Sequence, residues 1–252
     1  MFPDELNSLV EDLRRTAGSA EGKSRLAVLE AIRQSVLDRK VPNTCASYAA
    51  ALTSAIGANV SADSSNEEMV SAIIYLLSHV LSSISDKILR GKFVPMVESV
   101  NASISRFPSS AGIARHGLQC LSILLKSQED IAWSLPQTSD SFQRLLSFTV
   151  DSRPKVRKAA HGYVHNLVQN ASGASRGVIE SIIPTFCTGI FRSCTTADTV
   201  STQHLMDLLK DIGPTLSGKA INSMMGSVVQ LLSVGERTLH LQVLRNLTSL
   251  VS

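Results

Sequence analysis

The sequence has few aromatic and few charged residues for its length. Aromatic side chains make up 4% of the 252 residues and charged side chains 18%, whereas hydrophobic residues reach 44%. So few aromatic residues argue against an aromatic-rich β-sandwich, and so many apolar ones argue against a disordered chain. The net charge of +3 is too small to indicate nucleic-acid binding unless basic residues cluster locally.

The sequence also lacks the signals of a membrane or secreted protein. No apolar run is long enough to cross a bilayer, and no basic segment followed by an apolar run opens the chain. Cys45, Cys120, Cys187 and Cys194 never form a C-x-x-C motif. We therefore expect no membrane partner and free, buried thiols in a reducing compartment, with Cys187 and Cys194 on one apolar helix face.

Motifs that carry catalysis are missing as well. We find no glycine-rich phosphate loop, nucleophile elbow or paired-carboxylate motif. His161 and His165 have the spacing of two metal ligands on a helix, but no glutamate lies between them and no third ligand is evident. The sequence predicts a protein that is not an enzyme, with no catalytic residue, no cofactor, no metal and no small-molecule substrate.

Apolar residues recur at intervals of three and four, which is typical of amphipathic helices. The predicted stripes are Leu26, Leu29, Ile32, Val36 and Leu37; Met69, Ile73, Ile74, Leu76, Leu77 and Leu81; Ile113, Leu118, Leu121, Leu124 and Leu125; Val156, Ala159, Ala160, Val164 and Leu167; and Leu241, Leu244, Leu247 and Val251. Because no segment alternates with period two between turns, we expect essentially no sheet.

The helices form a degenerate repeat. Aligning Ala160 with Gly117 superposes the apolar positions that follow, a shift of about 43 residues in the HEAT and armadillo range. First helices are predicted to begin near Asp4, Asn43, Lys87, Thr138, Ser175 and Ser217, and second helices near Lys23, Asn66, Ser110, Pro154, Asp198 and Glu236. The prediction is an all-α solenoid of HEAT/armadillo type, with about six antiparallel helix pairs in a right-handed superhelix over residues 1–252. We expect a single solenoid and a fragment of a longer protein, because an apolar stripe without a polar cap precedes Ser252.

The segment from Phe142 to Ala160 resembles one HEAT repeat. An apolar first helix leads to Asp151 in the turn, and Pro154, a Val-Arg pair and two alanines open the second helix. Proline fits a first helical position because no amide donor is lost there. The two alanines allow close helix packing, and Arg157 is predicted to pair with Asp151 or with a turn carboxylate of a neighbouring repeat.

Together with residues 132–137 (Ala-Trp-Ser-Leu-Pro-Gln), this segment resembles the N-terminal region of the ribosomal RNA-processing protein twelve-like family, large HEAT-repeat proteins of the nucleolus. The resemblance implies a non-enzymatic factor of the nucleus and nucleolus. Such a factor would associate with pre-ribosomal particles, ribosomal RNA and other assembly or export factors, and would assist rRNA processing and nuclear export of subunits. The first-helix proline of HEAT repeats is present as Pro95 and Pro184 but absent near Gln143, and the fifth and sixth pairs lack the Asp and Val-Arg spacing.

Four cations, here called the basic cluster, gather around the start of the helix predicted at Pro154: Arg153, Lys155, Arg157 and Lys158. Cations at a helix N-terminus oppose the helix dipole, which suggests an external requirement. Phosphates of RNA, or an anionic partner, would supply it. In the alternative interpretation, Arg157 belongs to the ion pairs of the repeat itself and the other three side chains are merely solvated.

A second class of function stays open, a transport or cytoskeletal adaptor of karyopherin-like or tubulin-binding type. Such arrays share the periodicity, but a tubulin binder should carry basic and aromatic residues in successive turns. Here only the turn before Pro154 is strongly basic. The single tryptophan, Trp133, is either a partner anchor or a packing residue that fills the gap between repeats.

Overall fold

The chain is helical throughout the part that the structure describes. The computed structural model describes residues 2–62, 66–196 and 198–251, with residues 246–251 described as backbone only. These ranges contain thirteen α-helices, five short 3-10 helices and no strand, apart from an isolated bridge between Thr195 and Asp198. The predicted all-α class is confirmed. Among the described helices, none has the length and apolar character needed to cross a membrane.

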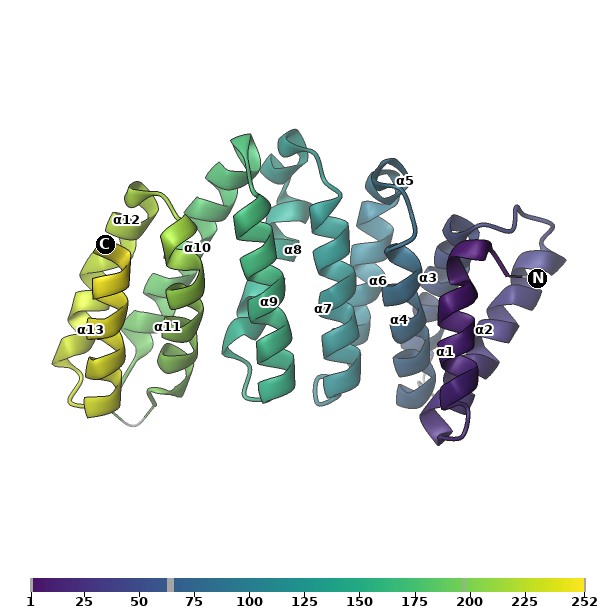
Figure 1. Cartoon of the computed structure of the whole chain (residues 1–252), viewed down its shortest axis with the longest axis horizontal. Coiled ribbons are helices and arrows are strands. Elements are labelled where there is room, and N and C mark those ends of the chain that lie inside the picture. Colours follow the sequence, from purple (N-terminus) through teal and green to yellow (C-terminus); the bar gives the residue numbers. More distant parts are fainter. Residues whose placement is uncertain (1, 63–65, 197, 252) are drawn as a thin grey trace. The chain divides into compact units, whose positions relative to one another are not determined.

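The helices form two compact units, Met1–Gln128 and Glu129–Ser252, called unit 1 and unit 2. In unit 1, α2 packs on α4 and α4 on α7, while α3 packs on α6. The second helices α4 and α7 thus form one row, and Figure 1 shows them in front of α3 and α6. The helices of unit 1 are α1 (Asn7–Thr16), α2 (Ala20–Asp38), α3 (Cys45–Ser61), α4 (Glu67–Leu81), α5 (Asp86–Gly91), α6 (Phe93–Arg106) and α7 (Ala111–Lys126), preceded by η1 (Asp4–Leu6).

Unit 2 repeats the arrangement. First helices pack on first helices, α8 on α10 and α10 on α12, and second helices on second helices, α9 on α11 and α11 on α13. Its α-helices are α8 (Pro136–Ser147), α9 (Pro154–Asn170), α10 (Gly173–Ser193), α11 (Val200–Ile212), α12 (Gly218–Gln230) and α13 (Arg237–Val251). Its 3-10 helices are η2 (Asp130–Ser134), η3 (Phe148–Val150), η4 (Gly213–Thr215) and η5 (Leu231–Ser233). All twelve predicted helix starts, six first and six second helices, agree with the structure to within three residues.

The third pair departs from the prediction because its first helix is broken into α5 and α6 at Lys92. Pro95 lies in the first turn of α6, and a proline has no amide to donate to the carbonyl four residues before it. That carbonyl belongs to Gly91, the last residue of α5, where a helix is weakest. The proline that marks a HEAT repeat here also interrupts its helix.

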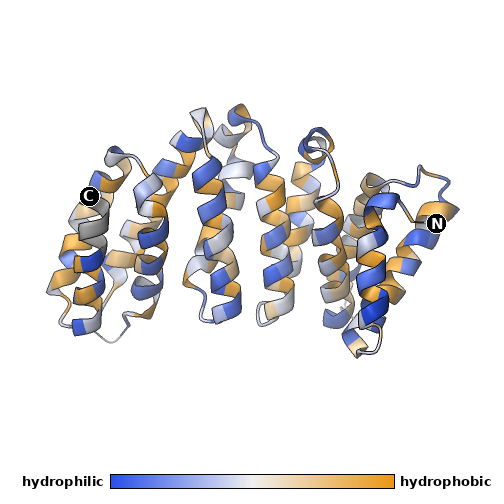
Figure 2. Cartoon of the chain, in the orientation of Figure 1, coloured by the Kyte–Doolittle hydropathy of each residue, from blue (hydrophilic) through white to orange (hydrophobic). Residues whose placement is uncertain are grey.

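The core consists of the predicted stripes, with local changes. In α4, α7 and α9 nearly all stripe residues are buried, and Figure 2 shows the apolar sides of neighbouring helices turned towards each other within each unit. Leu37 and Met69 are exposed instead. In α13 the predicted apolar face was wrong. Leu239 and Val243 are buried, whereas the predicted Leu241 and Leu244 are 47% and 52% exposed. The predicted stripe positions Leu247 and Val251 lie outside the described side chains.

Small and special residues set the closest contacts of the core. A Cβ on Gly117 would lie 2.8 Å from the Cδ1 atom of Ile104, so the close packing of α6 and α7 requires a glycine there. Trp133 is buried and packs edge-on against Phe142 at 5.8 Å between ring centroids, which supports the packing interpretation.

The four cysteines are free, but they do not share one environment. Cys45, Cys120 and Cys187 are buried, whereas Cys194 is partly exposed. The helix that was expected to place Cys187 and Cys194 on one apolar face ends at Ser193, so Cys194 lies beyond it. Burial raises the pKa of the Cys120 and Cys187 thiols well above the ordinary value.

Candidate functional site

The basic cluster lies at the start of α9, in a turn built by Asp151. The carboxylate of Asp151 accepts the backbone amide of Arg153 at 2.8 Å, and the Arg153 side chain at 2.9 Å through Nε and 2.8 Å through Nη2. Hydrogen bonds from the Arg153 side chain hold the pKa of Asp151 below its ordinary value, against the opposing effect of burial. The same pairing raises the pKa of Arg153. Much of the hydrogen-bonding capacity of the Arg153 guanidinium is therefore used within the turn.

Arg157 also contributes to this turn, by a different route from the predicted one. Its Nη1 atom donates to the main-chain carbonyl of Asp151 at 2.7 Å and to that of Ser152 at 3.4 Å. The carboxylate of Asp151 is already occupied by Arg153, so the predicted Arg157–Asp151 ion pair is replaced by a bond to backbone. Half of the basic cluster thus stabilises the turn that precedes α9.

Lys155 and Lys158 are the exposed members of the cluster. The structure records no hydrogen bond or ion pair from either ammonium group to any residue it describes. The Arg153 side chain, at the capping position, makes no capping hydrogen bond to the start of α9. Two unpaired cations therefore lie beside helix-start amides, an arrangement that favours anions.

The cluster borders an open groove of about 700 Å³ between α9 and α11. Its lining consists of Pro154, Arg157, Lys158, His161, Gly162 and His165 from α9, and Asp207 and Asp211 from α11. Neither aspartate was predicted from the sequence, because only the packing of one repeat on the next brings α11 to α9. Their i, i+4 spacing, combined with the repeat period, was the available signal.

The histidines of α9 have separate hydrogen-bond partners. The Nε2 atom of His161 donates to the carbonyl of Thr149 at 2.9 Å, and that of His165 lies 3.0 Å from the Gln169 amide nitrogen. Within the described residues, no group of three or more His, Cys, Asp and Glu side chains could hold a metal ion. Burial first, and then nearby Arg157, lowers the pKa of His204, so its imidazole adds little positive charge near the groove at neutral pH.

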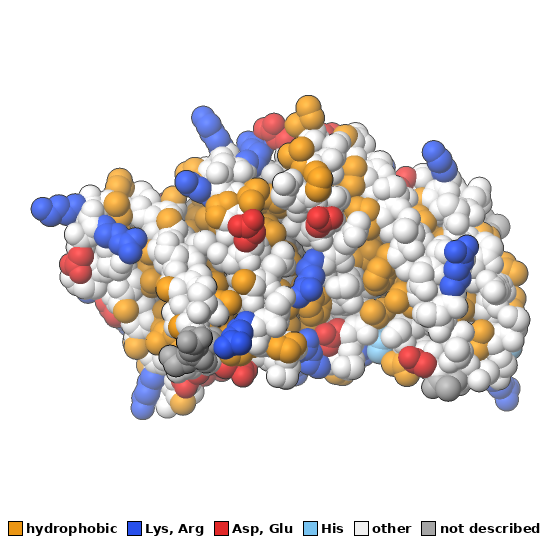
Figure 3. Space-filling view, turned by 180° about the vertical axis from the view of Figure 1, so that it is seen from behind, with side chains coloured by type: hydrophobic (Ala, Val, Ile, Leu, Met, Phe, Trp, Pro, Cys, Tyr) orange, Lys and Arg blue, Asp and Glu red, His pale blue; other side chains and the backbone are white. Residues whose placement is uncertain are grey.

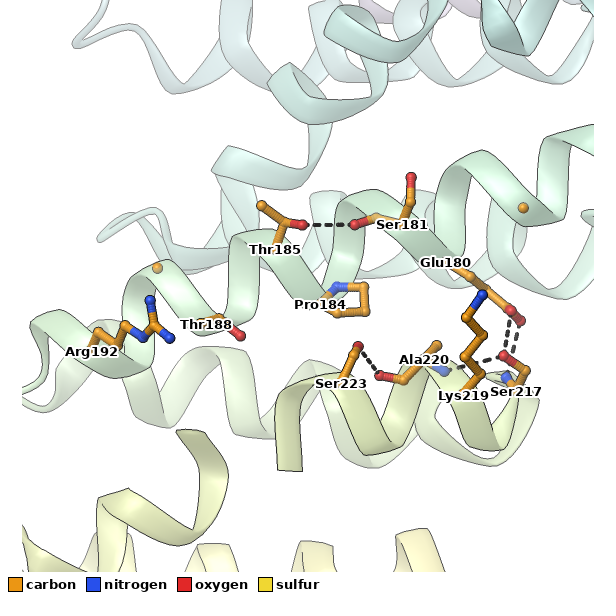
Figure 4. A pocket seen from close by; sticks show the side chains of 12 residues that line it. Glu180, Ser181, Pro184, Thr185, Thr188, Arg192, Ser217, Lys219, Ala220 and Ser223 are labelled. Atoms are coloured by element: carbon orange, nitrogen blue, oxygen red, sulfur yellow. Dashed lines mark hydrogen bonds between the residues drawn. The ribbon is translucent and has the colours of Figure 1, made fainter. Parts of the chain in front are cut away.

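A second groove, of about 620 Å³, lies between α10 and α12 (Figure 4). Its one carboxylate, Glu180, is occupied: it accepts the amide and hydroxyl of Ser217 at 3.0 and 2.5 Å and Nη1 of Arg176 at 3.2 Å. Arg192 and Lys219 lie at opposite ends, as Figure 4 shows. Small hydroxyl side chains between them are Ser181, Thr185, Thr188 and Ser223. The contacts of Glu180 across this groove hold two repeats together, and its lining has no charge cluster comparable with that of α9.

Basic residues elsewhere are more dispersed. On the face drawn in Figure 3, the coloured Lys and Arg side chains lie mostly singly, among uncharged and acidic ones. In unit 1, the Arg25 guanidinium stacks 3.6 Å above the Tyr75 ring, whose other neighbours are His79 and His116. Those contacts link α2, α4 and α7 and leave little of Arg25 exposed. The start of α9 therefore remains the strongest candidate for binding.

The chain is similar to known proteins that all belong to one family. A family model described as RRP12-like, N-terminal HEAT repeats matches residues 13–252. The RRP12-like protein of Homo sapiens is 28% identical over 226 residues, which is 86% of this chain. The RRP12-like protein of Gallus gallus is 29% identical over 86% of the chain. Ribosomal RNA-processing protein 12 of Saccharomyces cerevisiae is 30% identical over 41% of the chain and 9% of its own length.

The match concerns a limited part of these relatives. The chain spans 17% of the length of the human and chicken proteins. Within the chain, however, the family model leaves only the first twelve residues unmatched. Every helix from α2 onwards and the Asp-Ser-Arg-Pro turn lie inside that match, and this chain belongs to the family of RRP12-like N-terminal HEAT repeats.

Proposed function

We propose that this chain is a non-enzymatic scaffold of ribosome biogenesis that binds pre-ribosomal RNA through the basic cluster at the start of α9. Lys155 and Lys158 contact phosphates directly, and Arg153 and Arg157 hold the turn that precedes α9. The proposal rests chiefly on two exposed ammonium groups beside a helix start, where the dipole disfavours cations and no described residue pairs with them. Family membership supports the ribosomal context, since one relative is named Ribosomal RNA-processing protein 12.

The proposal extends to the protein as a whole. Residues 1–252 act as a single solenoid within a longer protein of the nucleus and nucleolus. That protein associates with pre-ribosomal particles and with other assembly or export factors, and assists rRNA processing and nuclear export of subunits. Stacked helix pairs suit this role because they offer an extended surface on which several partners can be held together.

The test is a fluorescence titration of the chain with a pre-ribosomal RNA fragment at several salt concentrations. Each lysine that neutralises a phosphate contributes roughly 0.7 to 0.9 to the log-log salt slope. Lys155→Gln with Lys158→Gln should therefore weaken binding and flatten the slope by about 1.5, with little change in sequence preference.

The control is Lys87→Gln with Lys126→Gln, which removes the same charge from exposed positions in α5 and α7. Melting curves should show all variants folded. Arg153 is not substituted in any variant, because its bidentate bond to Asp151 supports the turn. Equal affinity and slope for the Lys155/Lys158 variant and the parent would contradict the proposal.

A further inference from the structure

The groove between α9 and α11 has walls of opposite charge. Arg157 and Lys158 lie on the α9 wall, and Asp207 and Asp211 lie four residues apart on the α11 wall. Both aspartates are exposed, and Asp207 also accepts the Nε2 atom of Gln242 at 3.2 Å. A ligand that enters the groove must place a negative group against α9 and a hydrogen-bond donor or a cation against α11.

Duplex RNA does not meet this requirement. A duplex presents phosphates along both edges, so carboxylates on one wall repel one of its strands. The groove volume of about 700 Å³ is in the range of sites that hold one small molecule, which is too small for the body of a double helix. A single strand differs because its phosphates lie on one side and its unpaired bases turn to the other.

We propose that the groove binds a single-stranded segment of RNA, with its phosphates against Arg157 and Lys158 and the amino groups of its bases against Asp207 and Asp211. This inference rests on the proposed function and names the kind of RNA that the site takes. Carboxylates accept hydrogen bonds from the exocyclic amino groups of cytosine and adenine. Uracil presents a carbonyl oxygen at the corresponding place, which a carboxylate repels. The groove therefore prefers cytosine or adenine to uracil.

Gly162 gives the α9 wall of the groove a position without a side chain. It lies one residue after His161 and three before His165, and a Cβ atom built on it would meet no atom within 4 Å. Helix packing therefore does not require glycine at this position. Glycine also weakens a helix interior, so its presence here does not serve the stability of α9. A large side chain at residue 162 would fill the groove without removing any charge.

The experiment measures the fluorescence anisotropy of labelled oligo(C), oligo(A), oligo(U) and a duplex of equal length, each titrated with the whole chain. The parent should bind oligo(C) and oligo(A) at least about fivefold more tightly than oligo(U), as a good carboxylate–base contact gives, and should bind the duplex more weakly. Asp207→Ala with Asp211→Ala should abolish the base preference, because no acceptor for the amino groups remains. The same variant should strengthen duplex binding, because the repulsion is removed.

A steric pair of variants tests the same groove independently. Gly162→Leu should weaken single-strand binding several-fold. Gly226→Leu is the matched control, since Gly226 is also an exposed helical glycine with no atom within 4 Å of a built Cβ, and lies in α12 outside the groove. It should leave binding unchanged.

The outcomes separate this inference from the proposed function. If the lysine variant of α9 loses binding while the aspartate and Gly162 variants bind like the parent, RNA lies outside the groove; the inference is then wrong and the proposed function stands. Equal binding of the three single strands by the parent also overturns the inference. If the parent binds no RNA, or binds it without involving Lys155 and Lys158, both fail.

Discussion

Arg153 and Lys155 lie two residues apart at the start of α9, yet their surroundings give them different tasks. Arg153 has a planar guanidinium that forms a bidentate bond with Asp151, whereas Lys155 projects a single ammonium group with no partner among the described residues. The sequence set Arg157 apart as a candidate for an ion pair within the repeat, but it gave no reason to separate Arg153 from the two lysines. Only the geometry of the turn separates those that hold the fold from those that remain available to a ligand.

His116 shows how burial determines the charge of a single residue. It lies in α7 against the ring of Tyr75, and Arg115, Arg25 and His79 are its charged or titratable neighbours. Burial, followed by those neighbours, lowers its pKa to about 4. The ordinary value for histidine is about 6.5. The folded chain therefore keeps this imidazole neutral at pH values where the unfolded chain protonates it.

This difference predicts a loss of stability in mild acid. Between pH 6.5 and about 4 the unfolded state binds the proton and the folded state does not, so the free energy of unfolding decreases as the pH falls through that range. The melting temperature of the parent should decrease between pH 7 and pH 5, and that of His116→Gln should decrease less. An equal pH dependence for His116→Gln and the parent would contradict the explanation.

At the scale of helices, contacts between repeats take the place of the missing sequence motif. The fifth and sixth pairs lack the Asp and Val-Arg spacing, but Glu180 of α10 accepts hydrogen bonds from the amide and hydroxyl of Ser217, which caps the start of α12. Arg176 joins the same carboxylate and also donates to the carbonyl of Thr215 at 2.8 Å. A carboxylate at a helix N-terminus is stabilised by the helix dipole. Glu180, Arg176 and Ser217 therefore hold two neighbouring repeats together, whereas the Asp151–Arg153 pair stabilises a turn within one repeat.

Removing Glu180 should loosen the last repeats. Glu180→Ala leaves the Ser217 amide and the Arg176 guanidinium without their carboxylate, at a cost of about 1 to 3 kcal/mol in the free energy of unfolding. Urea unfolding followed by circular dichroism measures this loss. Glu98→Ala in α6 removes an exposed carboxylate and should change stability by less than about 0.5 kcal/mol. Similar unfolding curves for the two variants would show that the Glu180 contacts do not hold the repeats together.

For the molecule as a whole, the sequence was sufficient for the class of fold, the number of helix pairs and their starts. Apolar spacing and capping residues are local signals, and Ser19, Thr44, Asn66 and Ser217 all cap helices as such residues do. The α9–α11 groove depended on contacts between repeats, which no local pattern contains. The register of α13 was mistaken because Leu239, Leu241, Val243 and Leu244 offer more than one apolar face. Propensity alone does not choose between such faces.

The division into two units predicts how the chain responds to cutting. Each unit has three helix pairs and its own buried core, so residues 1–128 and 129–252, made separately, should each remain largely helical. Neighbouring repeats within each fragment stabilise one another, so the thermal unfolding of each fragment should remain cooperative. Circular dichroism of each fragment measures both quantities. A fragment that is unfolded at room temperature would contradict the expectation of separate cores.

The unequal burial of the four thiols has a practical consequence for handling this protein. A thiol-reactive dye attacks a thiolate that it can reach, so Cys45, Cys120 and Cys187, buried and with raised pKa values, react slowly in the folded chain. Cys194 is partly exposed, beyond the end of α10 in the same unit as the α9–α11 groove. The natural sequence thus offers one preferred position for a fluorophore, without cysteine substitutions that would disturb the core.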